Sequence, residues 1–232
     1  MIIPNKISGR SVTSISSYIL LDNVDNNLNI IVVPNTVNEI GKGAFANASK
    51  LVSLTIPFVG KSRDAIGYEA TIGYLFGENQ YTDSYETYYN LPYPGMDQHN
   101  SYLPTTLTEI SISDANNISD SAFAAAIKVE TINLNHGVTS IGDYAFSFML
   151  SLETIDLSNS LESIGLAAFW STPSLGSIYI PSSVTIMGEM AFGYNFGEPC
   201  VLTIYTSSDS RPFGWDFGWN PKNIEVVWSY NE

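Results

Sequence analysis

The sequence predicts a solenoid: stacked coils that carry a parallel β ladder, joined by short helical, 3₁₀ or irregular return segments and closed by an aromatic C-terminal cap. Three observations lead to this prediction. Four aliphatic residues recur at intervals of 23, namely Ile118, Ile141, Ile164 and Met187. An Ala-Phe pair follows each of them at positions +4 and +5, and aliphatic residues recur at +11, +14 and +16. A fixed period in this range is the signature of solenoid proteins.

The repeated positions divide each coil into a strand and a return segment. In the copy around Ile155, Ile155 and Leu157 alternate with Thr154 and Asp156, which predicts a strand with aliphatic residues inside and polar residues outside. One coil cannot bury enough apolar surface alone, so each must stack on the next with its strand in register. The strands should therefore form a parallel ladder.

The return segment should be compact. Gly at +1 allows a tight corner, Ala at +4 lets coils approach, and Phe at +5 fills the coil interior. The segment is short, so we expect a helical turn or a 3₁₀ turn in it. A further aliphatic residue before the next corner indicates a second short strand on the opposite side: Val37, Val138, Leu161 or Val184.

The chain reads as one domain, residues 1–232, with four parts. Residues 1–57 hold N-terminal repeats, in which Leu51, Leu54 and Ile56 follow the corner at Ile40. Residues 58–106 are an insertion, 107–200 are regular repeats, and 201–232 form a cap rich in Trp and Phe. Within the insertion, Ile72, Gly73 and Phe76 echo the corner pattern. It should therefore replace one return segment and then bulge outward.

The tyrosine-rich stretch of the insertion is the first candidate contact surface. It places aromatic residues in a polar loop, and loops often carry binding residues. The alternative is that these tyrosines pack against the flank of the ladder. The candidates are Tyr81, Tyr85, Tyr88, Tyr89 and Tyr93.

The outward positions of the ladder are the second candidate. Ser and Thr suit exposed strands, whereas a polar, slightly acidic concave face that gains tyrosines also suits a contact surface. Both interpretations stay open. The candidates are Thr131, Asn133, Thr154, Asp156, Ser177, Tyr179 and Tyr205.

Composition excludes several functions. The net charge is −14, although only 14% of residues are charged. An acidic chain without basic clusters argues against nucleic acid and against anionic membranes as partners. No apolar run is long enough to span a membrane, and the N-terminus does not resemble a secretory leader. We interpret the chain as a piece of a longer protein.

No catalytic, cofactor or metal site is predicted. The two histidines, His99 and His136, are far apart in sequence, and the single cysteine, Cys200, is expected to be a buried thiol. Acidic pairs such as Glu109 with Asp114 lack an obvious cleft between them. The polar cluster at residues 22–27 lacks the Gly and terminal Glu of a calcium loop. We expect a binding module rather than an enzyme.

The pattern Ile-Gly-x-x-Ala-Phe-x₅-Leu-x-x-Ile-x-Ile-Pro resembles the BspA-type leucine-rich repeat of bacterial surface proteins. The insertion, with Ile56-Pro-Phe-Val-Gly60 and Gly73-Tyr-Leu-Phe-Gly77, and the C-terminal motifs around Trp215 and Trp228 resemble modules of the same family. Two positions depart from its pattern: Ser119 stands for Gly, and Glu198 for Leu. The resemblance implies a leucine-rich repeat fold and a secreted or cell-surface protein without catalytic residues. Some members adhere to host matrix or to other cells.

Two functions compete at this point, with a purely structural spacer as a third. The first is adhesion, or recognition of a host-matrix or cell-surface protein. The second is carbohydrate binding, in which aromatic faces stack on sugars. Exposed and coplanar rings of Tyr179, Tyr205 and Trp215 would favour the carbohydrate, and a broad ladder with scattered aromatics would favour a protein.

Overall fold

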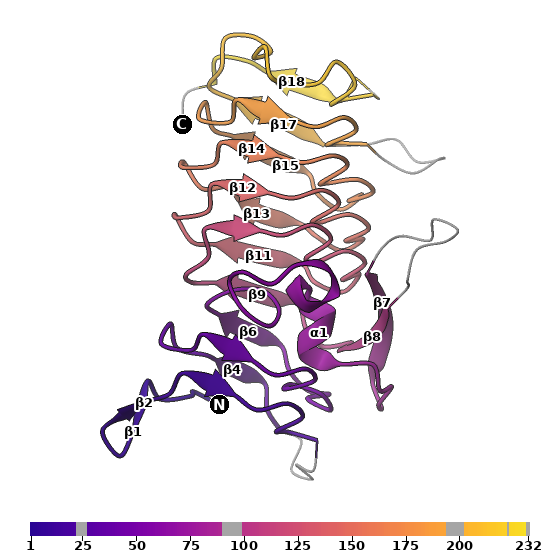
Figure 1. The fold of residues 1–232 in the computed structure, drawn as a ribbon. Coiled ribbons are helices and arrows are strands. Elements are labelled where there is room, and N and C mark those ends of the chain that lie inside the picture. Colours follow the sequence, from indigo (N-terminus) through magenta and orange to yellow (C-terminus); the bar gives the residue numbers. More distant parts are fainter. Residues whose placement is uncertain (22–26, 90–98, 194–201, 222, 231–232) are drawn as a thin grey trace.

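The computed structural model describes residues 1–21, 27–89, 99–193, 202–221 and 223–230, with the side chains of residues 88 and 89 left out. It is a β-solenoid whose coils stack from the N-terminus at one end of a rod to the C-terminus at the other (Figure 1). The predicted parallel solenoid is confirmed.

The ladder on one side of the rod contains eight strands, which we call the long ladder. Five form one sheet and three form a second sheet directly beyond it. Every adjacent pair within these sheets is parallel, and Thr131 faces Thr154, one 23-residue period later. The strands are β4 (Ile30–Val32), β6 (Ser53–Ile56), β9 (Glu109–Ile112), β11 (Thr131–Leu134), β13 (Thr154–Asp156), β15 (Ser177–Ile180), β17 (Thr203–Thr206) and β18 (Glu225–Val227).

A second set of two-residue strands runs along another side of the coils, and we call it the short ladder. A second short strand was expected from the aliphatic residue before each corner, such as Val138. The observed strands instead contain the corner residue itself, such as Ile141, and the coil that holds the insertion has none among the described residues. The strands of the short ladder are β3 (Ser14–Ile15), β5 (Glu39–Ile40), β10 (Asn117–Ile118), β12 (Ser140–Ile141), β14 (Ser163–Ile164) and β16 (Ile186–Met187). Strands β10, β12, β14 and β16 form one parallel sheet, and β3 pairs with β5. At the N-terminal end, β1 (Lys6–Ile7) and β2 (Arg10–Ser11) form a small antiparallel hairpin.

A column of phenylalanine rings fills the interior of the regular coils. Phe123, Phe146, Phe169 and Phe192 stack with successive ring centroids 5.3, 5.2 and 5.1 Å apart. Trp219 closes the column, its ring edge-on to Phe192 at 6.0 Å. Trp215 is only 1% exposed, and its indole N–H donates to the Val184 carbonyl at 3.0 Å. The predicted aromatic cap is therefore confirmed.

The return segments of the regular coils are turns rather than helices. In the coils that follow Ile118, Ile141 and Ile164, two residues adopt left-handed backbone angles, as Tyr144 (φ 57°) and Phe148 (φ 56°) do after Ile141. A left-handed residue cannot continue a right-handed helix, which explains why the expected helical turn does not form there. Among the described residues, the only helices are the 3₁₀ helix η1 (Gly67–Ala70) and α1 (Ile72–Phe76), both in the insertion.

The glycine after each corner residue has a different role from the one we expected. Gly142 and Gly165 do not have positive φ. A Cβ atom on either residue would lie 2.6 Å from a backbone nitrogen of the preceding coil. Close approach between coils therefore requires glycine, rather than an unusual turn. Ser119 stands at the same position after the insertion, where it lines an open groove.

The insertion interrupts the chain without interrupting the ladder, because β6 pairs directly with β9 in register. Helix α1 lies in the stack: the N–H of Phe45 donates to Leu75 O at 2.9 Å, and the N–H of Ile72 donates to Ala122 O at 2.8 Å. It thus occupies the place of a return segment. The following antiparallel hairpin, β7 (Ser84–Tyr89) and β8 (His99–Pro104), lies along one side of the rod (Figure 1).

Candidate binding surfaces

The outer face of the long ladder is built from alternate strand residues. Leu54, Ile110 and Ile132 point inward and are fully buried. Their neighbours along each strand point outward and are exposed or half-buried. This face therefore brings together all the ladder candidates of the sequence analysis: Thr131, Asn133, Thr154, Asp156, Ser177, Tyr179 and Tyr205.

Hydrogen bonds between strands order the middle of this face. The Asn133 amide donates to Glu109 Oε1 at 3.2 Å and to Ser111 Oγ at 3.1 Å. The hydroxyls of Thr131 and Thr154 are 3.2 Å apart. These side chains therefore have a structural role in the ladder, because their hydrogen bonds join adjacent strands.

Three tyrosines gather at the C-terminal end of the face, and we call them the tyrosine cluster. Tyr179 lies opposite Tyr205 in register. The ring of Tyr230 lies 4.7 Å from that of Tyr205 and 6.3 Å from that of Tyr179, inclined by 53° and 59°. Tyr230 was absent from the sequence prediction because it follows the last strand and has no repeat position. The nearby Trp215 is buried, so it cannot contribute a ring to this surface.

The face is also acidic. None of the eight strands of the long ladder contains Lys or Arg. Glu109, Asp156 and Glu225 occupy outward positions. Of the acidic pair considered for catalysis, Asp114 forms an ion pair with Arg63 at 2.5 Å, and Glu109 accepts the bond from Asn133.

The tyrosines of the insertion lie in different surroundings. Tyr85 packs against the hydrophobic core, and the hydroxyls of Tyr81 and Tyr85 are buried. This burial raises the pKa of both phenols above the ordinary tyrosine value. These two residues therefore pack as the alternative interpretation expects. Tyr88 and Tyr89 belong to β7, but their side chains lie outside the described part, as does Tyr93. A contact role for them stays a prediction.

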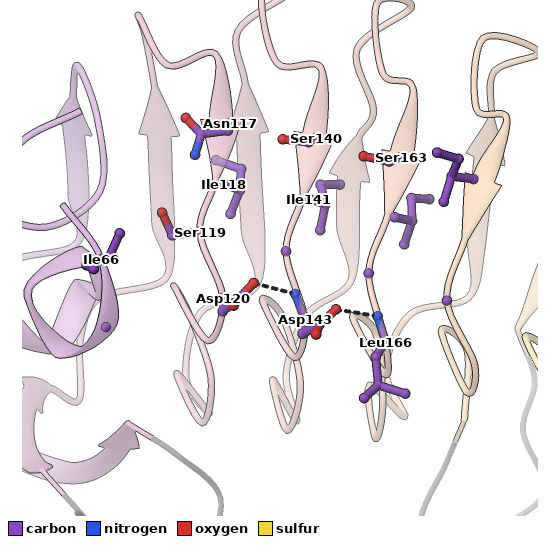
Figure 2. A pocket seen from close by; sticks show the side chains of 16 residues that line it. Ile66, Asn117, Ile118, Ser119, Asp120, Ser140, Ile141, Asp143, Ser163 and Leu166 are labelled. Atoms are coloured by element: carbon purple, nitrogen blue, oxygen red, sulfur yellow. Dashed lines mark hydrogen bonds between the residues drawn. The ribbon is translucent and has the colours of Figure 1, made fainter. Parts of the chain in front are cut away.

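A shallow groove of about 610 Å³ runs along the short ladder (Figure 2). Its polar lining comes from equivalent positions of successive coils, with Ser140 opposite Ser163 and Asp120 one coil before Asp143. Asp120 Oδ1 accepts a bond from the Asp143 N–H at 2.8 Å, and Asp143 Oδ1 accepts one from the Leu166 N–H at 2.7 Å. These aspartates bind adjacent coils together, which accounts for their recurrence.

Metal binding and membrane insertion have little support in the part of the chain that the structure describes. No group of three or more His, Cys, Asp or Glu side chains is placed to hold a metal there. His99 stacks on Tyr68 with ring centroids 4.4 Å apart. Residues 22–26 of the possible calcium cluster, Cys200 and Glu198 are outside the described residues. None of the described helices has the length and apolar character that crossing a membrane requires.

The fold defines the class of protein: a leucine-rich repeat solenoid, a type of protein that typically presents extended surfaces for binding. The chain belongs to the family described as the BspA type leucine rich repeat region, whose model matches in six copies over residues 4–70 and 98–198. This family and fold are typically non-enzymatic scaffolds for protein interaction. No curated protein matches the chain.

Solved structures of three bacterial proteins are similar to this chain. A leucine-rich repeat protein of T. pallidum shares 18% identity with a TM-score of 0.40, over 88% of this chain and 56% of its own. One from Bacteroides ovatus shares 22% with a TM-score of 0.38, over 98% and 62%. A leucine rich cell surface protein of Faecalibacterium prausnitzii shares 15% with a TM-score of 0.41, over 100% and 88%. The chain thus spans less than two thirds of the first two.

Proposed function

We propose that this chain is a non-enzymatic module that recognises a protein at the cell surface or outside the cell, and that adhesion to a host-matrix or cell-surface protein is its role. One observation carries the proposal. From β6 to β17, the outward positions of the long ladder hold only polar residues and tyrosines, and this face ends in the tyrosine cluster. Such a surface suits a broad partner, and tyrosines are enriched among the residues that dominate binding energy at protein interfaces.

The geometry of the aromatic residues favours a protein over a carbohydrate. A carbohydrate would be favoured by a platform of coplanar rings, whereas the rings of Tyr205 and Tyr230 are inclined to each other by 53°. Trp215, which would complete a stacking platform, is buried in the cap. Carbohydrate binding therefore remains the alternative outcome of the test.

The test measures binding of the purified chain to a panel of extracellular-matrix proteins and to a glycan array. Thr154→Arg places a large side chain on the long ladder and should abolish protein binding. Ser163→Arg places the same side chain on the short ladder of the same coil, and should preserve it. If Ser163→Arg abolishes binding while Thr154→Arg preserves it, the contact face is wrong. If only glycans bind, the partner class is wrong.

The proposed location has a separate test. Labelling of intact cells that produce the natural protein, with an antibody raised against this chain, should stain the outside of the cell or detect the protein in the medium. Staining only after permeabilisation would contradict a surface or secreted location.

A further inference from the structure

We propose that the protein partner presents an extended segment rich in Lys and Arg, which lies along the long ladder and places one cationic side chain on the tyrosine cluster. This inference rests on the proposed function, because it names the chemistry of the partner at the same face. Three features of the described residues carry it: the charge of the ladder, the spacing of its carboxylates and the aromatic cluster at its end.

The long ladder has carboxylates but no cations of its own. Within the described residues, Glu109, Asp156 and Glu225 form no ion pair, and the strands of the ladder supply no Lys or Arg. Three basic residues outside the ladder form ion pairs with carboxylates that are also outside it: Lys42 with Glu78 at 2.7 Å, Lys61 with Glu69 at 3.0 Å and Arg63 with Asp114 at 2.5 Å. The ladder's carboxylates are therefore available to cations from outside.

The three carboxylates are spread along the axis of the rod in two neighbouring rows of outward positions: Glu109 and Glu225 occupy one row, and Asp156 occupies the other, two residues further along its strand. Parallel strands lie about 4.8 Å apart. Strand β9, which carries Glu109, is therefore about 10 Å from β13, which carries Asp156. Strand β13 is about 14 Å from β18, which carries Glu225. An extended peptide advances about 3.3 Å per residue. One that lies along the axis would meet a carboxylate at roughly every third or fourth residue, a spacing that an ordinary basic segment can match.

The tyrosine cluster suits the same partner. The face of an aromatic ring attracts an ammonium or guanidinium group, and the attraction grows when the cation is partly desolvated. Tyr179 and Tyr205 are half-buried, and Tyr230 is 38% exposed, so their rings are held by packing and still reach solvent. The net charge of −14 would also attract a cationic segment from a distance.

The first test uses a fluorescent peptide of about ten residues, long enough to reach from β9 to β18, with Arg at every third or fourth position among Gly and Ser. A second peptide carries Glu in place of Arg. Fluorescence anisotropy should show that the Arg peptide binds and that added salt weakens it, while the Glu peptide does not bind. Equal binding of both peptides, or binding of neither, would overturn the inference.

The second test locates the binding. The face variant, Glu109→Gln with Asp156→Asn and Glu225→Gln, should weaken binding of the Arg peptide about tenfold, because three exposed ion pairs of ordinary strength amount to roughly one power of ten. The face variant keeps a hydrogen-bond acceptor for Asn133.

The matched control, Asp64→Asn with Glu162→Gln and Glu189→Gln, removes the same charge from exposed positions outside the long ladder. It should weaken binding less than about twofold, since only the long-range field changes. An equal loss in both variants would show diffuse attraction to an acidic protein, and the proposed face would be wrong.

The third test addresses the tyrosine cluster. Tyr205→Leu should weaken binding of the Arg peptide about two- to fivefold, and Tyr205→Phe should retain it, because the attraction comes from the ring face and not from the hydroxyl. If Tyr205→Leu and Tyr205→Phe have the same melting temperature and change the affinity for the Arg peptide equally, the ring of Tyr205 does not take part in binding. If the basic peptides fail in all tests while a matrix protein still binds in a Thr154-dependent way, this inference fails and the proposed function stands.

Discussion

At the scale of single residues, the fold depends on what fits inside and between coils. Each regular coil contributes one phenylalanine to the column, and Phe146 stacks on a ring at either side, 5.3 and 5.2 Å away. Between coils the limit is space, since a Cβ atom on Gly165 would lie 2.6 Å from the Asp143 nitrogen. The interior thus selects a large residue at one position and no side chain at another.

Removal of one ring from the column should be costly. Phe146→Ala leaves a cavity between two fully packed rings and should lower the free energy of unfolding by about 3–5 kcal/mol, measured by chemical denaturation. Phe213→Ala makes the same truncation at a fully exposed ring. It should change the free energy by no more than about 0.5 kcal/mol. A small loss for Phe146→Ala would mean that the column does not support the stack.

Addition of one methyl group between coils should also destabilise the protein. Gly165→Ala brings a Cβ atom into contact with backbone, which cannot move without parting two coils, so we expect a loss of about 1–3 kcal/mol. Gly176→Ala is the control, because no atom lies within 4 Å of its added Cβ. It should be neutral or stabilising by up to about 1 kcal/mol. The thermal melting temperatures of the two variants should therefore shift in opposite directions or by clearly different amounts.

The sequence predicted the phenylalanine positions because a buried ring recurs with the period of the coil. It did not predict the left-handed residues of the return segments. Those positions hold Ser121, Tyr144, Ala167 and Met190, whereas Gly or Asn would usually mark such angles. The tight stacking of coils imposes this backbone on residues that do not favour it, so local residue preferences give no signal.

At the scale of elements, the two ladders could be predicted and the packing of the insertion could not. Alternation and period place the strands, and the insertion's Ile72, Gly73 and Phe76 echo a corner. Nothing in a tyrosine-rich polar stretch shows which rings turn inward. In the structure Tyr85 packs against the hydrophobic core, and close to it the Thr87 hydroxyl donates to Ala124 O at 2.8 Å.

The buried phenols of Tyr81 and Tyr85 predict a loss of stability in alkali. Burial raises the pKa of both side chains in the folded protein, whereas in the unfolded chain they ionise near the ordinary value of about 10. Their contribution to stability is therefore complete below about pH 10 and is lost as the pH rises above it.

Unfolding by urea at about pH 9 and about pH 11 checks this directly. The variant Tyr81→Phe with Tyr85→Phe cannot ionise at these positions and should lose less stability across this interval than the parent chain. Equal losses in parent and variant would show that these hydroxyls are not buried. At neutral pH the variant should be at least as stable as the parent chain. The two hydroxyls that it removes are buried and have no hydrogen-bond partner among the described residues, so their removal costs no hydrogen bond.

At the scale of the whole molecule, the chain is a linear stack in which the strands of successive coils pair in order. We propose that it behaves as one domain over residues 1–232, because the long ladder passes from β6 to β9 without a break despite the insertion. The candidate contact face follows from the same linear order. The sequence places its outward residues, whereas Tyr230 joins them only through the folding of the cap.

The most direct measurement of this account is the unfolding of a chain shortened by one period. Deletion of residues 141–163 joins Ser140 to Ile164, restores the Ser-Ile pair of the short ladder and brings Phe123 next to Phe169 in order. We expect circular dichroism to show a folded, β-rich protein with one cooperative transition at a lower denaturant concentration. Deletion of residues 141–152, about half a period, should leave the chain unfolded. If the full-period deletion is also unfolded, the coils are not interchangeable layers of a stack and the account is contradicted.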